Sequence, residues 1–193
     1  MKNNTQKLVG IGVLTAIVVA LQFLSMAIRF SNFSVTLSLI PIVVGAALYG
    51  KGAGAWLGLA FGITVLATGD ASAFLTVNPI GTFITVLGKG ILAGFSVGLV
   101  YELIQKKNKA VATYVSGVIC PIVNTGVFLI CCFVFFLDTI KGWAEGFGFG
   151  DDYVKYMILG LVGINFLFEL AINLILSPTI VRLIDLIQKK IKK

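Results

Sequence analysis

One stretch of the chain carries four polar side chains at helical spacing among apolar neighbours. They follow one another at intervals of 4, 3 and 4 residues and are Asn78, Thr82, Thr85 and Lys89. This periodicity places all four on one face of a helix. At 1.5 Å per residue, Lys89 would lie roughly 15 Å along that helix from its start. Such a face of amide, hydroxyl and ammonium groups could bind an anionic molecule that also forms hydrogen bonds.

Two further apolar stretches carry polar groups that could meet this face. Asn165, Glu169 and Asn173 recur every four residues, and Asn124 lies in the middle of another stretch. Polar groups inside a membrane are costly, so each needs a partner or a function. In one interpretation they only hold helices together, with Lys89 and Glu169 as an internal ion pair. The favoured interpretation is a ligand pocket, because all three faces reach the same half of the predicted bundle.

The residue types exclude most catalytic chemistry. The chain has no His, which removes a histidine general base, an imidazole metal ligand and a Ser-His-Asp triad. Cys120, Cys131 and Cys132 lie in one apolar stretch without the CxxC spacing of a metal site. No GxxxxGK[ST] motif occurs, so the chain cannot energise transport by hydrolysing ATP itself. We therefore predict no catalytic residue, no metal and no cofactor.

The composition is that of a membrane protein. Of 193 residues, 58% are hydrophobic and only 12% are charged. Mean hydropathy is +1.03, and a soluble domain could not bury so much apolar surface. The net charge of +7 comes from Lys residues at helix ends, a placement that indicates lipid headgroup contact rather than nucleic-acid binding.

Apolar stretches predict the helices that position the polar faces. A hydrocarbon core of about 30 Å needs about 20 residues per crossing. We predict an all-α membrane protein with six transmembrane helices in one domain, residues 1–193. The helices are expected near residues 8–28, 33–49, 53–68, 79–104, 111–137 and 156–187. The last exceeds one crossing, and it is expected to protrude or to break at Pro178.

The distribution of charge predicts the orientation of the bundle. The first apolar run follows Lys2 and Lys7 like a signal peptide, but its length favours a retained helix. With six crossings both termini lie on one side, together with most of the Lys and Arg residues. The other side carries Arg29, Lys141 and Lys155 among several acids. The positive-inside rule therefore places both termini in the cytoplasm.

Two predicted outer loops could cover the pocket. Residues 69–78 combine small residues with an aromatic one, and residues 143–149 begin with Trp143. Aromatic rings there could stack on a ligand. They could equally belong to an interfacial aromatic belt.

Small residues recur every four positions on the first predicted helix, at Gly12, Ala16 and Ala20. Such a face lets another helix approach closely. The other helix could belong to a partner subunit or to the same chain.

The sequence resembles the substrate-binding S components of energy-coupling factor (ECF) vitamin transporters over nearly its whole length. The similar stretches are Ala16-x-x-x-Ala20, LIPIVVGAALYGKGAGAWLG at 39–58, NPIGTFITVLGKGILAG at 78–94 and CPIVNTG at 120–126. The resemblance implies an S-component bundle that binds a vitamin among the outer halves of helices four to six. It also implies docking of the first helices on an EcfT-type membrane coupling subunit, which is driven by two cytoplasmic ATPases. The loaded S component would then topple in the membrane and release its ligand inside.

We expect the chain to capture a vitamin outside a bacterial plasma membrane, with pantothenate as the best fit. Pantothenate offers a carboxylate for Lys89, and two hydroxyls and an amide for the Asn side chains. Lipoate, folate, riboflavin and pyridoxine are the alternatives. The predicted ligand-binding residues are Asn78, Thr82, Thr85, Lys89, Asn124, Trp143, Asn165 and Glu169.

Two other classes of protein are weaker alternatives. A membrane-embedded lipid-modifying enzyme would need a reactive group with a positioned partner. Asp70 and the pair Asp151 and Asp152 are the best candidates, but they show no recognisable acid/base or metal arrangement. A stand-alone transporter often carries an internal repeat, and none is visible.

Overall fold

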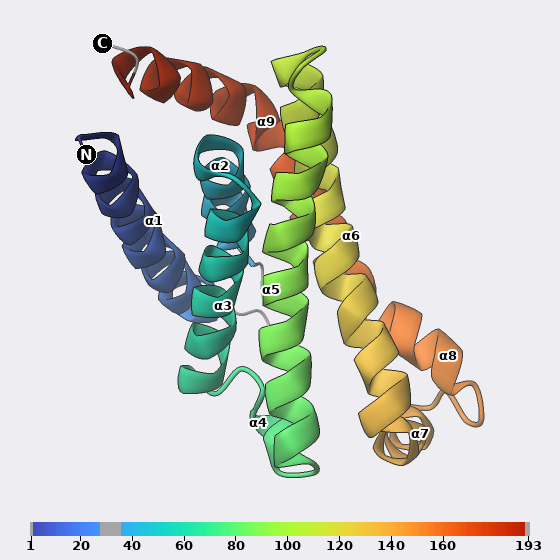
Figure 1. Cartoon of the computed structure of the whole chain (residues 1–193). Helices are drawn as coiled ribbons and strands as arrows, with labels where there is room; N and C mark the ends of the chain where they lie inside the picture. Colours follow the sequence, from blue (N-terminus) through green and yellow to red (C-terminus); the bar gives the residue numbers. More distant parts are fainter. Residues whose placement is uncertain (1, 28–35, 192–193) are drawn as a thin grey trace.

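The computed structural model describes residues 2–27 and 36–191, in which all regular structure is helical (Figure 1). Four helices there are long and apolar enough to cross a membrane: α1 (Lys2–Ala27), α5 (Pro79–Ile104), α6 (Lys109–Phe135) and α9 (Ile164–Ile191). Helices α2 (Leu39–Tyr49) and α3 (Lys51–Ala67) are apolar but shorter. The all-helical prediction is confirmed, whereas six crossings remain a prediction, since the 11 residues of α2 rise only about 16 Å.

The connections at one end contain short helices that the sequence did not predict, namely α4 (Ser72–Leu75), α7 (Leu137–Gly146) and α8 (Tyr153–Lys155). The last predicted helix begins as expected at Tyr156, but its first part is the π-helix η1 (Tyr156–Gly163). Residues 143–149 were predicted as an outer loop, but residues 143–146 belong to α7, so the prediction is wrong for these four residues. Its glycines lower helix propensity, yet α7 forms because Ile140 and Ala144, one turn apart, are both buried.

Two predicted helix boundaries also need correction. The second helix begins at Leu39 rather than near residue 33, and residues 33–35 lie outside the described residues. Of the two alternatives predicted for the last helix, a break at Pro178 is absent, because α9 continues through it to Ile191. The last turns of α9, in red, cross one end of the bundle (Figure 1).

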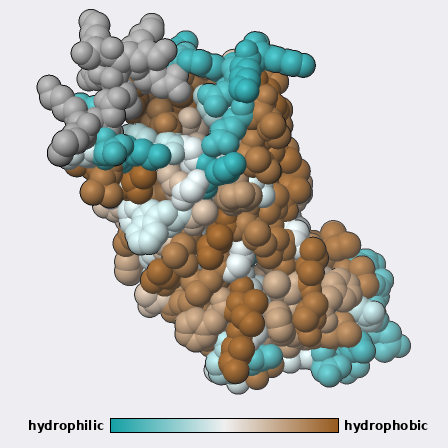
Figure 2. All heavy atoms as spheres, viewed as in Figure 1, coloured by the Kyte–Doolittle hydropathy of each residue, from teal (hydrophilic) through white to brown (hydrophobic). Residues whose placement is uncertain are grey.

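Both chain termini lie at the same end of the molecule, here called the terminal end, and α4 and α7 lie at the opposite, far end (Figure 1). Hydrophilic side chains gather toward the two ends of the face seen in Figure 2, and hydrophobic ones cover its middle. Many large apolar side chains of α1, α5, α6 and α9 are exposed. This distribution fits a bundle surrounded by lipid.

Helices α3 and α5 touch backbone to backbone. A Cβ atom on Gly58 would overlap the carbonyl group of Gly90, and one on Gly54 would overlap that of Gly94. Glycine at four-residue spacing on both helices permits this approach. Between α2 and α3, Gly50 makes the turn alone with φ of 90°, a conformation that disfavours other residues.

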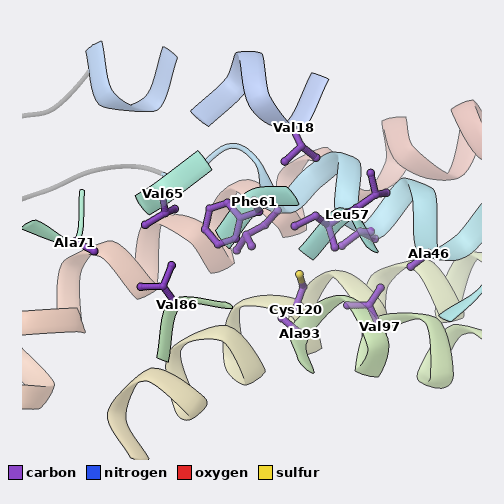
Figure 3. Packing of buried hydrophobic residues seen from close by; sticks show 13 residues of the cluster. Val18, Ala46, Leu57, Phe61, Val65, Ala71, Val86, Ala93, Val97 and Cys120 are labelled. Atoms are coloured by element: carbon purple, nitrogen blue, oxygen red, sulfur yellow. The ribbon is translucent and has the colours of Figure 1, made fainter. Parts of the chain in front are cut away.

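The main core cluster joins α1, α2, α3, α5 and α6 (Figure 3). Val18 contributes from α1, Leu57 and Phe61 from α3, and Val97 and Cys120 from α5 and α6. A second cluster at the far end contains Phe136 and many further aromatic rings. Between these two clusters the packing opens into a cavity.

Candidate ligand-binding cavity

A cavity of about 350 Å³ lies in the half of the bundle toward the far end. This volume suits a small organic molecule. Its polar and charged lining comes from six parts of the chain and consists of Gln22, Thr36, Asp70, Thr82, Thr85, Lys89, Asn124, Thr125, Asn165 and Glu169. Its walls are apolar and largely aromatic, and include Phe61, Phe74, Phe128, Phe136 and Phe166.

Helix α5 brings the polar side chains Thr82, Thr85 and Lys89 to the cavity, and its first turn is capped. Asn78 is the N-cap, and its Oδ1 accepts a hydrogen bond from the Gly81 backbone at 2.9 Å. The hydroxyls of Thr82 and Thr85 donate to backbone carbonyls four residues earlier, at 2.8 and 2.7 Å. Their oxygen lone pairs are therefore the groups left to accept a hydrogen bond from a ligand.

Lys89 lies near the middle of α5 and reaches the cavity between two aromatic rings. Its Nζ lies 5.8 Å from the ring centroid of Phe61 and 5.2 Å from that of Phe128. Cation–π contacts stabilise a desolvated ammonium by about 2 kcal/mol or more. This arrangement holds a positive charge in the cavity and leaves its N–H groups available for an anion.

Helices α6 and α9 bring amide and carboxyl groups to the same space. Asn124 is 5% exposed and Glu169 is 6% exposed. The Oδ1 atoms of Asn124 and Asn165 are buried, and no described residue donates a hydrogen bond to them. Buried amides are normally satisfied, so these two oxygens are suited to accept a hydrogen bond from a molecule in the cavity.

Lys89 and Glu169 face the same cavity and interact electrostatically, but they form no direct ion pair within 4.0 Å. The Thr36 side chain also lies close to the Glu169 carboxyl group. The interpretation of these two residues as a closed internal ion pair therefore does not describe the structure. Both side chains remain available to a molecule in the cavity.

Phe74 forms part of the cavity wall nearest the far end. Its ring packs edge-on against those of Phe128, Phe136 and Trp143, with centroid distances of 5.6, 5.0 and 5.3 Å. These contacts connect the short helix α4 to α6 and α7. The segment between α3 and α5 thereby covers the cavity.

The structure separates the predicted ligand-binding residues into two groups. Those that line the cavity are Thr82, Thr85, Lys89, Asn124, Asn165 and Glu169. Asn78 and Trp143 lie outside the lining, because Asn78 caps α5 and Trp143 packs behind Phe74. Asn173, on the same face of α9, is buried and donates from Nδ2 to the Glu169 carbonyl oxygen at 2.8 Å.

Sequence reasoning missed the contributions of Gln22 and Thr36 and did not place Asp70 in the pocket. Gln22 is a single polar residue late in α1, and its Nε2 donates to Asp70 Oδ2 at 2.8 Å. The available signal was that Gln22 is a long polar side chain within an apolar helix. Its partner could not be identified because the two residues are 48 positions apart.

The small-residue face of α1 has no covering helix within the described part of the chain. Gly12, Ala16 and Ala20 are all exposed, and nothing lies within 4 Å of a Cβ built on Gly12. The buried residues of α1, such as Val18 and Gln22, lie on another face. The face is therefore open to a helix from outside.

Comparisons with known proteins agree on one family. The family described as "ECF transporter, substrate-specific component" matches residues 6–181. The pantothenic acid transporter PanT of Lactococcus lactis subsp. cremoris (strain MG1363) is 27% identical over 198 residues, covering 93% of this chain and 94% of that protein. No solved structure matches the chain.

Proposed function

Because the chain belongs to the family of ECF transporter substrate-specific components, we propose that it binds pantothenate in this cavity for import into a bacterial cell. Family membership indicates a membrane transport subunit with a small-molecule substrate rather than an enzyme. The observation that carries the choice of pantothenate is the cavity lining, in which one Lys, two amide oxygens to which no described residue donates and an apolar wall converge.

The chemistry of pantothenate matches these groups one by one. Its carboxylate would bind the Lys89 ammonium, and a charge-assisted hydrogen bond of this kind is the strongest that the cavity offers. Its hydroxyls and amide would pair with Asn124, Asn165 and Glu169. Its methyl groups would contact the Phe wall. The similarity to the Lactococcus transporter supports the same ligand.

The proposed transport cycle needs further subunits. We infer that Gly12, Ala16 and Ala20 dock on an EcfT-type membrane coupling subunit, and that two cytoplasmic ATPases supply energy. Toppling of the loaded subunit would then release pantothenate into the cytoplasm. This scheme requires the whole chain to form one six-helix membrane domain with both termini in the cytoplasm. The position of both termini at one end of the molecule supports that orientation (Figure 1).

The experiment that tests the ligand is direct binding to the purified chain. Radiolabelled pantothenate should bind with one site per chain and should be displaced by unlabelled pantothenate. Lipoate, folate, riboflavin and pyridoxine serve as competitors of different shape and charge. Displacement by one of these at lower concentration than pantothenate would contradict the proposed ligand. Cysteine-labelling of introduced terminal residues from either side of the membrane tests the orientation.

A further inference from the structure

A chain of hydrogen bonds leads from the cavity wall into helix α1. Gln22 Nε2 donates to Asp70 Oδ2 at 2.8 Å, and the Ser38 hydroxyl lies 3.2 Å from both Gln22 Oε1 and the Val18 carbonyl oxygen. The Leu37 backbone N–H donates to Ser25 Oγ at 3.3 Å. Residues 37 and 38, directly before α2, are therefore attached to α1 at several points.

The same segment also approaches the opposite side of the cavity. The Thr36 side chain lies close to the Glu169 carboxyl group of α9. Gln22, Thr36, Asp70 and Glu169 all line the cavity. A ligand that fills the cavity must therefore contact this network or replace one of its hydrogen bonds.

The inner part of the network is sealed from solvent. Gln22 is 3% exposed, Ser25 2% and Ser38 0%. A buried polar group needs its hydrogen bonds, so these side chains follow one another when one of them moves. Ser25 and Ser38 do not line the cavity, and they can transmit a change there without contacting the ligand.

Helix α1 presents its two faces to different partners. Successive residues of an α-helix turn by about 100°, so residues two apart point in nearly opposite directions. Gln22 faces the cavity, whereas Ala20 lies on the exposed face with Ala16 and Gly12. Any rotation or shift of α1 imposed at Gln22 therefore changes the position of the small-residue face.

We propose that Gln22 and Ser38 couple ligand binding to docking, so that pantothenate in the cavity sets the position of α1 and thereby the affinity for the coupling subunit. This inference rests on the proposed function. Gln22 and Ser38 act here as positioning residues for α1. By linkage, the same factor by which pantothenate changes docking must apply to the effect of docking on pantothenate binding.

The test measures docking with and without ligand. The full chain carries a fluorescent label and is titrated with the coupling subunit and its ATPases in nanodiscs, at zero and at saturating pantothenate. Three forms are compared: the unaltered chain, Ser38→Ala combined with Ser25→Ala, and Ser177→Ala as the control. Ser177 is equally buried, but its hydroxyl donates only to Asn173 in its own helix.

Pantothenate should strengthen docking of the unaltered chain and of the Ser177→Ala variant by at least about fivefold, as is typical of coupled sites. In the double variant this ratio should fall to within about twofold of one, while pantothenate still binds. A general loss of stability would weaken docking of the loaded and the empty forms alike, so the ratio separates coupling from a structural role.

Two results would overturn the coupling while leaving the proposed function intact. These are an unchanged ratio in the double variant, or docking of the unaltered chain that does not respond to pantothenate. Failure of the unaltered chain to bind pantothenate would instead contradict the proposed function, and the coupling with it.

Discussion

Helix α5 takes part in two regions that are built on different principles. Toward the terminal end, its Gly90 and Gly94 touch the backbone of α3 at Gly58 and Gly54. Toward the far end, its polar face lines the cavity together with side chains of α6 and α9. In the first region, glycines without side chains allow α3 and α5 to touch. In the second region, side chains of several helices surround an open cavity.

The comparison shows how a binding cavity can be supported in a protein with few polar contacts. Backbones in direct contact cannot separate without losing many van der Waals contacts at once. The α3–α5 pair thus provides a rigid reference on which Lys89 is held. The opposite walls, made by α4, η1 and the segment before α2, depend on individual side-chain contacts that a ligand can rearrange.

The largest effect is expected from filling the α3–α5 contact. Gly90→Val places a branched side chain against the Gly58 carbonyl group, and we expect a loss of about 3 kcal/mol or more of stability. Gly88→Val is the matched control on the same helix, because nothing lies within 4 Å of its Cβ position. Thermal unfolding in detergent measures both, and equal melting temperatures would contradict a tightly packed region.

The exposed face of α1 should behave unlike either region of α5. Ala16→Trp combined with Ala20→Trp adds bulk where no residue of the described chain packs, so folding and pantothenate binding should be retained. Uptake by cells that contain the coupling subunit and ATPases should collapse, since a bulky face blocks close helix approach. Normal uptake would show that α1 does not dock there, and lost pantothenate binding would assign these residues to the internal core.

Removing the cavity's cation should weaken ligand binding without affecting the packed region. We expect Lys89→Met to reduce pantothenate affinity by about tenfold or more, or about 1.4 kcal/mol, with an unchanged melting temperature. Lys141→Met is the control, because Lys141 also lies over an aromatic ring, 5.6 Å from that of Tyr153, but outside the cavity. The measurement is the equilibrium affinity of each purified variant for pantothenate. Equal affinities of the two variants would show that Lys89 does not bind the ligand.

The smallest effect is expected at the aromatic cover of the cavity. Phe74→Leu keeps an apolar side chain in the cavity wall but removes three edge-on ring contacts. Pantothenate should dissociate several-fold faster, because the α4 segment is held less firmly. Phe83→Leu, on an exposed position of α5, is the control in a filter-binding dissociation assay. Identical dissociation rates would show that Phe74 does not retain the ligand.

Periodicity predicted the regions in which local pattern and tertiary environment agree. The polar faces of α5 and α9 were identifiable because their residues recur every three or four positions. Glycine at positions 54, 58 and 62 and at 90, 94 and 98 was also a visible signal of close helix packing. The pairing of α3 with α5 was not predicted, because small residues on one helix do not indicate which other helix packs against them.

The parts of the cavity that could not be predicted come from single residues without a repeating pattern. Gln22 and Thr36 each enter the wall because the fold brings them there from outside the predicted polar faces. Asn78 was assigned to the ligand because it continues the polar face of α5. It instead satisfies the free N–H groups at the helix start, a local need that exists whether or not a ligand binds.

The π-helix η1 determines the angular phase of everything that follows it. In a π-helix each N–H bonds five residues back instead of four, so this segment contains more residues per turn than an α-helix. If the same eight residues were wound as an α-helix, with about 100° per residue, the downstream side chains would point in another direction. Asn165 and Glu169 would then leave the cavity, although neither residue had been changed. A homologue with an α-helix of the same length at this point would need its binding groups at shifted positions to recognise the same molecule.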